Sequence, residues 1–317
     1  MSGSAVVLGA GGGIGRAVVT ELASKGIAVR AVTRTGRGDM PAGVAHVAAD
    51  LATPEGARAA CEGAATVYHC AQPPYGRWAQ DFPGLNACIA EAAAAAGAKL
   101  VFADNLYMFG PVRGPIHDGS AQEPSSKKGR VRKELADALL ADHAAGRMPV
   151  TIGRASDYFG PGGSGSVAGL VVDDALAGKK ARWPASADMP HTFSYLPDVA
   201  RGLVTLGSRD DADGSAWVLP AAPPLTARGF VQHLERALGQ PVQLSVTSKV
   251  AMRVAGLFIA EAREIPDIWY QFETPFVADA SRFESVLGPF AVTPVDEALE
   301  ATVAWYRAQA PASEAAS

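Results

Sequence analysis

The sequence has few cysteines, and their spacing excludes two kinds of site. Only three occur in 317 residues, at Cys61, Cys70 and Cys88. They are too few and too irregularly spaced for a zinc site or a disulfide framework. We therefore expect no metal, and we expect buried free thiols, which suit a reducing compartment.

Long hydrophobic runs and blocks of one charge are also missing. The net charge is −4 and the Lys and Arg residues form no long block, so we expect neither nucleic acid nor a membrane as a partner. The most apolar later window, around 250–260, is short and contains Arg253, so it cannot span a bilayer. No basic segment precedes an apolar one at the N-terminus, so no signal peptide is expected. The sequence predicts a soluble, cytoplasmic protein that binds a small molecule.

Short apolar runs alternate with helical patterns over the first half of the chain. Strands are expected in "SAVVLG", "IAVRAVT", "VAHVAA", "ATVYHC", "AKLVFA" and "MPVTIGR". Helices are expected over about 14–25, 54–61, 80–96 and 127–143. Because parallel strands need crossover connections, this alternation predicts an α/β fold with a doubly wound parallel sheet of the Rossmann type. Beyond Gly160 glycine and proline become frequent, which indicates a second, smaller domain of mixed strands and helices.

A glycine cluster lies between the first predicted strand and the first predicted helix. The stretch "VVLGAGGGIGRAVV" places Gly9, Gly12 and Gly15 at three-residue intervals, with Gly13 and Ile14 between them. Glycines allow a tight turn and a close approach of pyrophosphate to the backbone, and the free N–H groups of the helix favour an anion. The cluster predicts a dinucleotide site.

Two arginines follow the second predicted strand, where an acid that binds a ribose hydroxyl is otherwise expected. The stretch "VTRTGR" offers Arg34 and Arg37, which can pair with a 2′-phosphate. We therefore predict NADP as the cofactor. Asp50, after the third strand, either accepts from the adenine amino group or caps the following turn.

These motifs resemble the extended, epimerase/dehydratase-like branch of the short-chain dehydrogenase/reductase superfamily. The resemblance is carried by "GAGGGIG", "AADL", "VYHCAQPP", "RASDYFGPG", "HTFSYLPDVARGLVTL" and "WVLPAAPPLT". It implies a Rossmann core over 1–160 and 191–220, a C-terminal α+β substrate domain over 161–190 and 221–308, and a homodimer. Residues 309–317 are predicted to form a flexible tail. The resemblance also implies that Leu51, His69 and Ala71 border the cofactor.

The residues that active members of this superfamily use are replaced here. Such members carry a Ser or Thr after strand five, then a Tyr and a Lys four residues apart on the next helix. Counting along the chain puts Asn105 at the hydroxyl position, and Ser126 and Arg130 at the Tyr and Lys positions. No tyrosine occurs between Met108 and Gly153, so the usual proton donor is absent. Arg130 stays charged and can hold ribose hydroxyls as a fork of donors.

Other residues are candidates to fill the site. Tyr107 and Lys128 are alternative catalytic groups, each set against an ordinary role in the core or in solvent. The candidates for substrate contact are Gln72, Tyr158, His191, Trp183 and Tyr270.

Three functions follow from this pattern. We expect an NADPH-dependent reductase of a small, partly apolar molecule with a C=O, C=N or activated C=C group, with a non-standard proton donor or none. One alternative is an epimerase or dehydratase in which bound cofactor is transiently reduced. The other is an inactive NADP(H)-binding sensor or scaffold.

Overall fold

The computed structural model describes residues 4–255 and 265–309, and its largest unit is a parallel sheet of seven strands. The strand order is β10-β6-β5-β4-β1-β2-β3, with every pairing parallel. The strands are β1 (Ser4–Leu8), β2 (Val29–Thr33), β3 (Ala45–Ala48), β4 (Ala64–His69), β5 (Lys99–Asp104), β6 (Val150–Arg154) and β10 (Ser215–Val218). Because the order reverses between β1 and β4, this is the doubly wound Rossmann fold that the sequence predicts.

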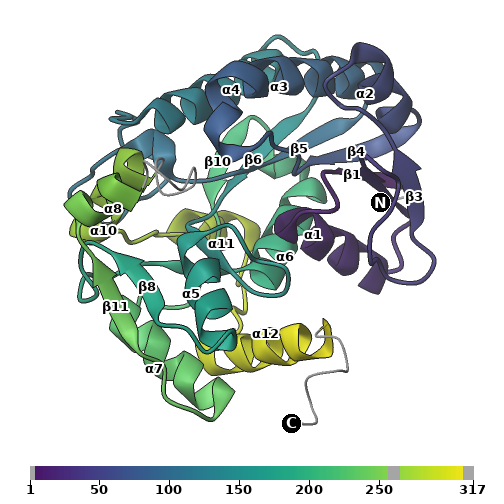
Figure 1. Cartoon of the computed structure of the whole chain (residues 1–317). Helices are drawn as coiled ribbons and strands as arrows, with labels where there is room; N and C mark the ends of the chain where they lie inside the picture. The colour runs from purple at the N-terminus through teal and green to yellow at the C-terminus, as the bar shows by residue number, and fades with distance from the viewer. Residues whose placement is uncertain (1–3, 256–264, 310–317) are drawn as a thin grey trace.

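Helices cover both faces of the sheet. One face carries α2 (Pro54–Cys61), α3 (Trp78–Ala95) and α4 (Lys127–Ala144), and the other carries α1 (Gly13–Ser24) and α6 (Leu196–Gly207) (Figure 1). A separate hydrophobic core fills the space on each face. The strands are thus buried on both sides, which explains their nearly continuous apolar runs.

The predicted elements of the first half are confirmed to within about two residues at each end. Apolar periodicity sets these bounds, and two helix starts are fixed by a side-chain cap. Thr53 Oγ1 accepts from the backbone N–H of Gly56 at the start of α2, and Ser126 Oγ accepts from that of Gly129 at the start of α4.

A second unit follows β6 and lies beside the sheet (Figure 1). It contains two small parallel sheets: β7 (Asp157–Phe159) pairs with β9 (Phe193–Tyr195), and β8 (Ala181–Pro184) pairs with β11 (Leu244–Thr247). The helices of this unit and of the C-terminal part of the chain are α5 (Val167–Leu176), α7 (Ala227–Leu238), α8 (Lys249–Ala255), α10 (Tyr270–Glu273), α11 (Ser281–Leu287) and α12 (Val295–Gln309).

Single turns of 3₁₀ helix occur in several connections: η1 (Tyr75–Arg77), η2 (Tyr107–Phe109), η3 (Asp210–Ala212) and η4 (Ile265–Ile268). Most of the predicted tail lies outside the described residues.

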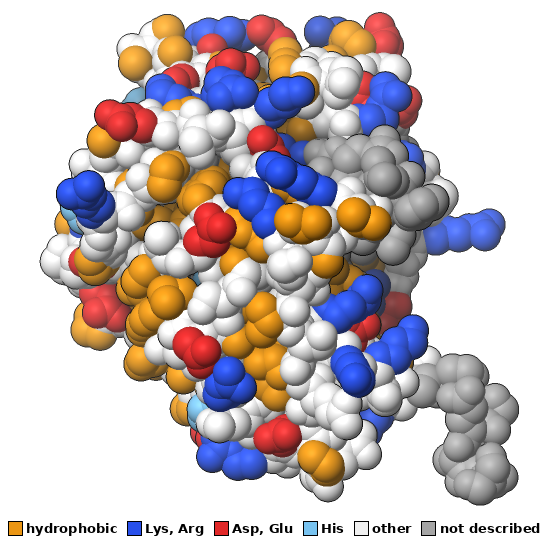
Figure 2. All heavy atoms as spheres, turned by 60° about the vertical axis from the view of Figure 1, so that its left-hand side comes forward, with side chains coloured by type: hydrophobic (Ala, Val, Ile, Leu, Met, Phe, Trp, Pro, Cys, Tyr) orange, Lys and Arg blue, Asp and Glu red, His pale blue; other side chains and the backbone are white. Residues whose placement is uncertain are grey.

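The structure also shows the state of the cysteines and the distribution of charged side chains. All three cysteines are free thiols, with Cys61 buried and Cys70 and Cys88 half-buried. Across 4–255 and 265–309, no helix is long and apolar enough to cross a membrane, and no three His, Cys, Asp or Glu residues cluster to hold a metal. Charged side chains of both signs are interspersed over the face in Figure 2.

A buried carboxylate ties the end of β5 to its neighbours. Asp104, the last residue of β5, is fully buried and accepts from Arg132 Nη1 at 3.4 Å and Arg154 Nε at 3.2 Å. Its backbone oxygen accepts from the hydroxyl of Tyr158 at 3.0 Å. Asp104 therefore connects β5, α4, β6 and β7.

Removal of this carboxylate is expected to destabilise the fold strongly. Asp104→Ala leaves two buried guanidinium groups without their counter-ion, which costs about 3–5 kcal/mol. In the control Asp137→Ala, the lost ion pair with Lys133 is exposed on α4, so the cost is below about 1 kcal/mol. Urea unfolding monitored by circular dichroism measures both. Equal losses in the two variants would contradict the role given to Asp104.

Candidate functional site: a cleft at the carboxyl edge of the sheet

One cleft of about 1620 Å³ follows the carboxyl ends of the central strands. Its walls include residues directly after β1, β2, β4, β5 and β6, together with residues of the second unit. In open parallel α/β sheets, ligands bind at this edge, where the strand order reverses. The cleft is therefore the candidate site.

The glycine cluster forms the floor of one end of the cleft. Gly9 has φ +78°, and a Cβ there would come within 2.6 Å of Ala71 Cα, while a Cβ on Gly15 would overlap Gly9 O. Helix α1 has Gly12 as its N-cap, without a side-chain cap, so its first N–H groups stay available. Gly9, Gly12, Gly13, Ile14 and Gly15 all line the cleft. This close backbone with free donors fits the pyrophosphate of a dinucleotide.

Two exposed arginines border the same end. Arg34 and Arg37 line the cleft beyond β2, and within the described chain no carboxylate pairs with either. Asp50 and Leu51 line it after β3. Asp50 Oδ1 accepts from the N–H of Ala52 at 3.1 Å, so of the two roles expected for Asp50 the structure contains the turn cap.

The last residue of β4 and the loop that follows it differ in their exposure to the cleft. Ala71 and Gln72 line the cleft, whereas His69 is fully buried outside it, packed against Phe82 and Phe102. Burial lowers the pKa of His69 to about 3, so its imidazole is neutral. His69 therefore belongs to the core and lies outside the residues that line the cleft.

The loop after β5 faces the cleft, but its polar groups are already engaged. Asn105 lines the cleft, and its Oδ1 accepts from the N–H of Tyr107 at 3.0 Å. The Tyr107 hydroxyl lies 3.5 Å from that of Tyr75, and burial raises the pKa of Tyr107 to about 12. A phenol with this pKa is a weaker acid than free tyrosine.

The register predicted for α4 is corrected by two residues. Ser126 is the helix cap and Arg130 is exposed to solvent, outside the cleft. Lys128 and Arg132, which share a helix face, are the buried pair at the expected spacing of four. The Lys128 ammonium lies 4.2 Å from the ring centre of Tyr75, a cleft residue, but Lys128 does not itself line the cleft.

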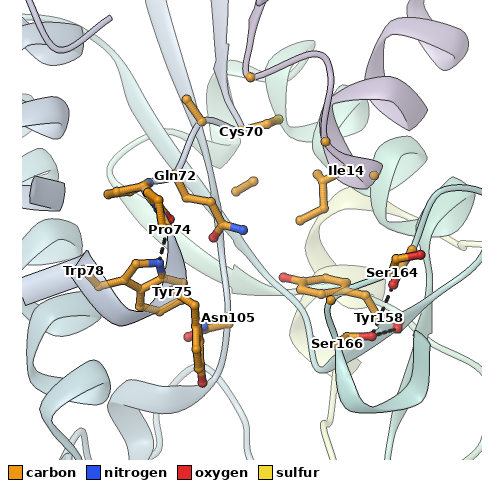
Figure 3. A pocket seen from close by; sticks show the side chains of 18 of the residues that line it. Ile14, Cys70, Gln72, Pro74, Tyr75, Trp78, Asn105, Tyr158, Ser164 and Ser166 are labelled. Atoms are coloured by element: carbon orange, nitrogen blue, oxygen red, sulfur yellow. Dashed lines mark hydrogen bonds between the residues drawn. The ribbon is translucent and has the colours of Figure 1, made fainter. Parts of the chain in front are cut away.

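Arg132 is a cleft residue that the sequence prediction missed. Its guanidinium lies 4.4 Å from the ring centre of Trp78, and its Nη2 donates to Gln72 Oε1 at 3.2 Å. The Gln72 side chain extends from one wall toward Tyr158 on the other (Figure 3). The only sequence signal for Arg132 was its spacing of four from Lys128. Arg132 thus orients a polar side chain that points into the cavity.

The far end of the cleft is largely apolar. Trp183 and Tyr158 line it, whereas His191 and Tyr270 lie behind the wall, and Tyr270 donates to the backbone oxygen of Tyr107 at 3.4 Å. The other apolar lining residues of the second unit are Val167, Leu170, Pro184, Met252, Ile265, Ile268, Phe272 and Phe276.

One carboxyl group at this end was also missed. Asp157 lines the cleft at the start of β7, and burial raises its pKa to about 7. In the sequence it is one acid in "RASDYFGPG", and nothing local marks it as buried.

Comparisons with known proteins agree with this architecture. The model of the NAD-dependent epimerase/dehydratase family matches residues 5–219. The search of curated proteins found no match. At identities of 17–22%, the likeness to solved structures shows the fold.

Three solved structures illustrate the likeness. MoeE5 in complex with UDP-glucose and NAD is 22% identical, with 97% of this chain and 99% of that chain covered and a TM-score of 0.78. UDP-glucose 4-epimerase of Thermotoga maritima, with UDP-glucose, is 17% identical over 96% and 99%, with a TM-score of 0.79. The dTDP-glucose 4,6-dehydratase DesIV of Streptomyces venezuelae, with NAD, is 17% identical over 96% and 97%, with a TM-score of 0.78.

A methyl group at Gly15 is expected to disable the dinucleotide end. Gly15→Ala must displace the loop because the new Cβ overlaps Gly9 O, and we expect the affinity for NADPH to fall at least about tenfold, or 1.4 kcal/mol. In the control Gly229→Ala, in the first turn of α7, the nearest contact of the Cβ is an ordinary 3.4 Å, so binding is unchanged. Titration calorimetry measures both affinities. Unchanged binding by Gly15→Ala would contradict the placement of the pyrophosphate.

Proposed function

We propose that this chain, which belongs to the NAD-dependent epimerase/dehydratase family, is an NADPH-dependent reductase. Its substrate is a partly apolar organic molecule with a C=O, C=N or activated C=C group. The observation that carries the proposal is a continuous cleft that joins the glycine floor and two unpaired arginines to an apolar wall. When bound, NADPH supplies the hydride.

The choice of NADPH rests on Arg34 and Arg37. Both are exposed at the end of β2 and line the cleft. A 2′-phosphate gives them charge-assisted hydrogen bonds worth about 1.5–3 kcal/mol each. Several structurally similar proteins were solved with NAD, so the cofactor preference is a property of these two side chains rather than of the fold.

The choice of an apolar substrate rests on the opposite end. Aromatic and aliphatic side chains form most of its wall, and the carboxyl groups of Asp157 and Asp174 also line it. Arg182, which also lines the cleft, is bound to Asp174 by two contacts of 2.8 and 3.0 Å. An uncharged, partly apolar molecule fits this end because most of its lining side chains are apolar.

The chemistry must proceed without the usual tyrosine. The buried pair four residues apart on α4 is Lys128 and Arg132, and neither is a tyrosine. A guanidinium is a poor proton donor, and Arg132 Nη2 donates to Gln72 Oε1, so the role of Arg132 is to position that amide. The substrate either needs no proton at the reacting atom or receives it from another group.

An epimerase or dehydratase is the second candidate. The family model favours it, and the similar structures include proteins with UDP-glucose bound. Such an enzyme would oxidise and reduce its substrate within one turnover and would not consume free NADPH.

Removal of one arginine is expected to change cofactor selectivity. Arg34→Ala loses one phosphate contact, so the Kd for NADPH rises by about tenfold or more while that for NADH stays constant. Arg113→Ala, at an exposed site outside the cleft, serves as the control and changes neither. Fluorescence titration of the nicotinamide gives the Kd of the parent and of each variant for NADPH and for NADH. Tighter binding of NADH than of NADPH by the parent chain would contradict the assignment.

A substrate panel separates the two functions. We expect the purified chain to consume NADPH with apolar aldehydes, cyclic imines or enones, because these fit the apolar wall. With UDP-glucose we expect neither NADPH loss nor an isomerised sugar. Absorbance of NADPH and chromatography of the sugar nucleotide are the measurements. Isomerisation without NADPH loss would support the second candidate instead.

A further inference from the structure

Asp157 is a carboxyl group enclosed in the wall of the cleft. It begins β7, where the chain leaves β6 for the second unit, and its side chain is 11% exposed. It lines the same cavity as Tyr107 and Phe272. The ionised form of Asp157 helps to raise the pKa of Tyr107.

Backbone donors hold this carboxyl group in place. Asp157 Oδ2 accepts from the N–H of Ala168 at 3.1 Å, in the first turn of the ten-residue helix α5. Hydrogen bonds from the backbone of Val167 and Tyr158 also act on it. These donors favour the carboxylate, yet burial outweighs them and raises the pKa of Asp157 to about 7.

The imidazole of His191 faces the carboxyl group of Asp157. His191 Nε2 lies 3.8 Å from Asp157 Oδ2, is buried and has no hydrogen-bond partner in the structure. The ring also makes a hydrogen bond to the backbone of Gln271. Two lone pairs that face each other repel unless one atom carries a proton. Because burial lowers the pKa of His191 to about 4, that proton belongs to Asp157 at neutral pH.

The other acids of the cleft are poorly suited to give up a proton. The Tyr158 hydroxyl donates to Asp104 O, and burial raises its pKa. Asp174 accepts hydrogen bonds from Arg182, and the hydrogen bonds from Arg77 lower the pKa of Asp81. Asp50 caps a turn at the opposite end. Among the described residues, Asp157 is the cleft acid that is both protonated near pH 7 and able to ionise there.

We propose that Asp157 is the catalytic acid of this cleft, with His191 as the positioning residue whose facing lone pair favours its protonated form. The inference rests on the proposed reductase function. During reduction of a carbonyl, the carbon gains the hydride that reduced dinucleotide loses, and the oxygen gains the proton of Asp157. The O–H bond of the acid breaks as that of the alcohol forms, and water then returns a proton to the carboxylate.

The first test follows the carboxyl group itself and needs no substrate. Infrared difference spectroscopy of the full chain between pH 5 and 9 should show a carboxylic acid C=O band that disappears with a midpoint near 7. Asp157→Asn should remove this band, whereas Asp174→Asn, the matched control in the same cleft, should keep it. The same band in Asp157→Asn would overturn the proposal.

Thermal stability gives a second readout that is independent of activity. The pKa of Asp157 is raised from 3.8 to about 7 by folding, so ionisation destabilises the native state as pH rises across that window. Asp157→Asn should therefore gain in Tm relative to the parent from pH 4 to 7, with no further gain above pH 7. A constant difference would overturn the assignment of the titration to Asp157.

The catalytic step is tested with nitrobenzaldehyde as an apolar probe and NADPH as reductant. Asp157→Asn should lower kcat by about 10²–10⁴ with the Kd for NADPH unchanged. Full kcat in this variant would overturn the proposal. A parent chain that turns over no carbonyl probe contradicts the proposed function, and the infrared test then decides alone whether Asp157 holds a proton.

His191 is tested by its effect on the titration. His191→Phe keeps the stacking with Phe272 but removes the lone pair, so the midpoint of the Asp157 band should move to lower pH and kcat should fall with KM unchanged. His191→Gln, which restores an acceptor, should recover part of both. An unmoved midpoint in His191→Phe would overturn the positioning role.

Discussion

The site depends on one buried ionic contact, that of Asp104 with Arg132 and Arg154. This contact places the end of β5 against α4 and β6, and through the Asp104 backbone oxygen it also fixes Tyr158. Buried charges are stable only when each is paired, so the three side chains have little freedom to move. Arg132 in turn directs Gln72 into the cleft. The contact therefore connects residues on both walls of the cavity, Gln72 and Tyr158.

The buried arginine of α4 follows the same logic. Arg132 satisfies Asp104 and stacks on an aromatic ring, which a lysine would do less well because it lacks a planar fork. The proton then has to come from elsewhere, and the second unit supplies a buried carboxyl group beside a neutral imidazole. Cofactor binding and proton transfer are thus assigned to different parts of the fold.

Much of this could be predicted from the sequence because it depends on local pattern. The βαβ alternation, the glycine floor and the cleft positions of Arg34 and Asn105 follow from periodicity and from the places where strands end. The register of α4 could not, since Ser126 is a cap rather than a site residue and a cap leaves no trace in apolar spacing. Asp157 was missed because its burial comes from tertiary contacts. One of these is with His191, which lies far along the chain, just before β9.

The central claim is that the cleft transfers hydride from NADPH to an external substrate without a tyrosine acid. The most direct test is a turnover with NADPH that carries deuterium at the transferable position of C4, followed by mass spectrometry of the product. The account predicts that each product molecule gains one deuterium at the reduced carbon. Product that forms without deuterium, or a sugar nucleotide that isomerises while NADPH keeps its label, would contradict it.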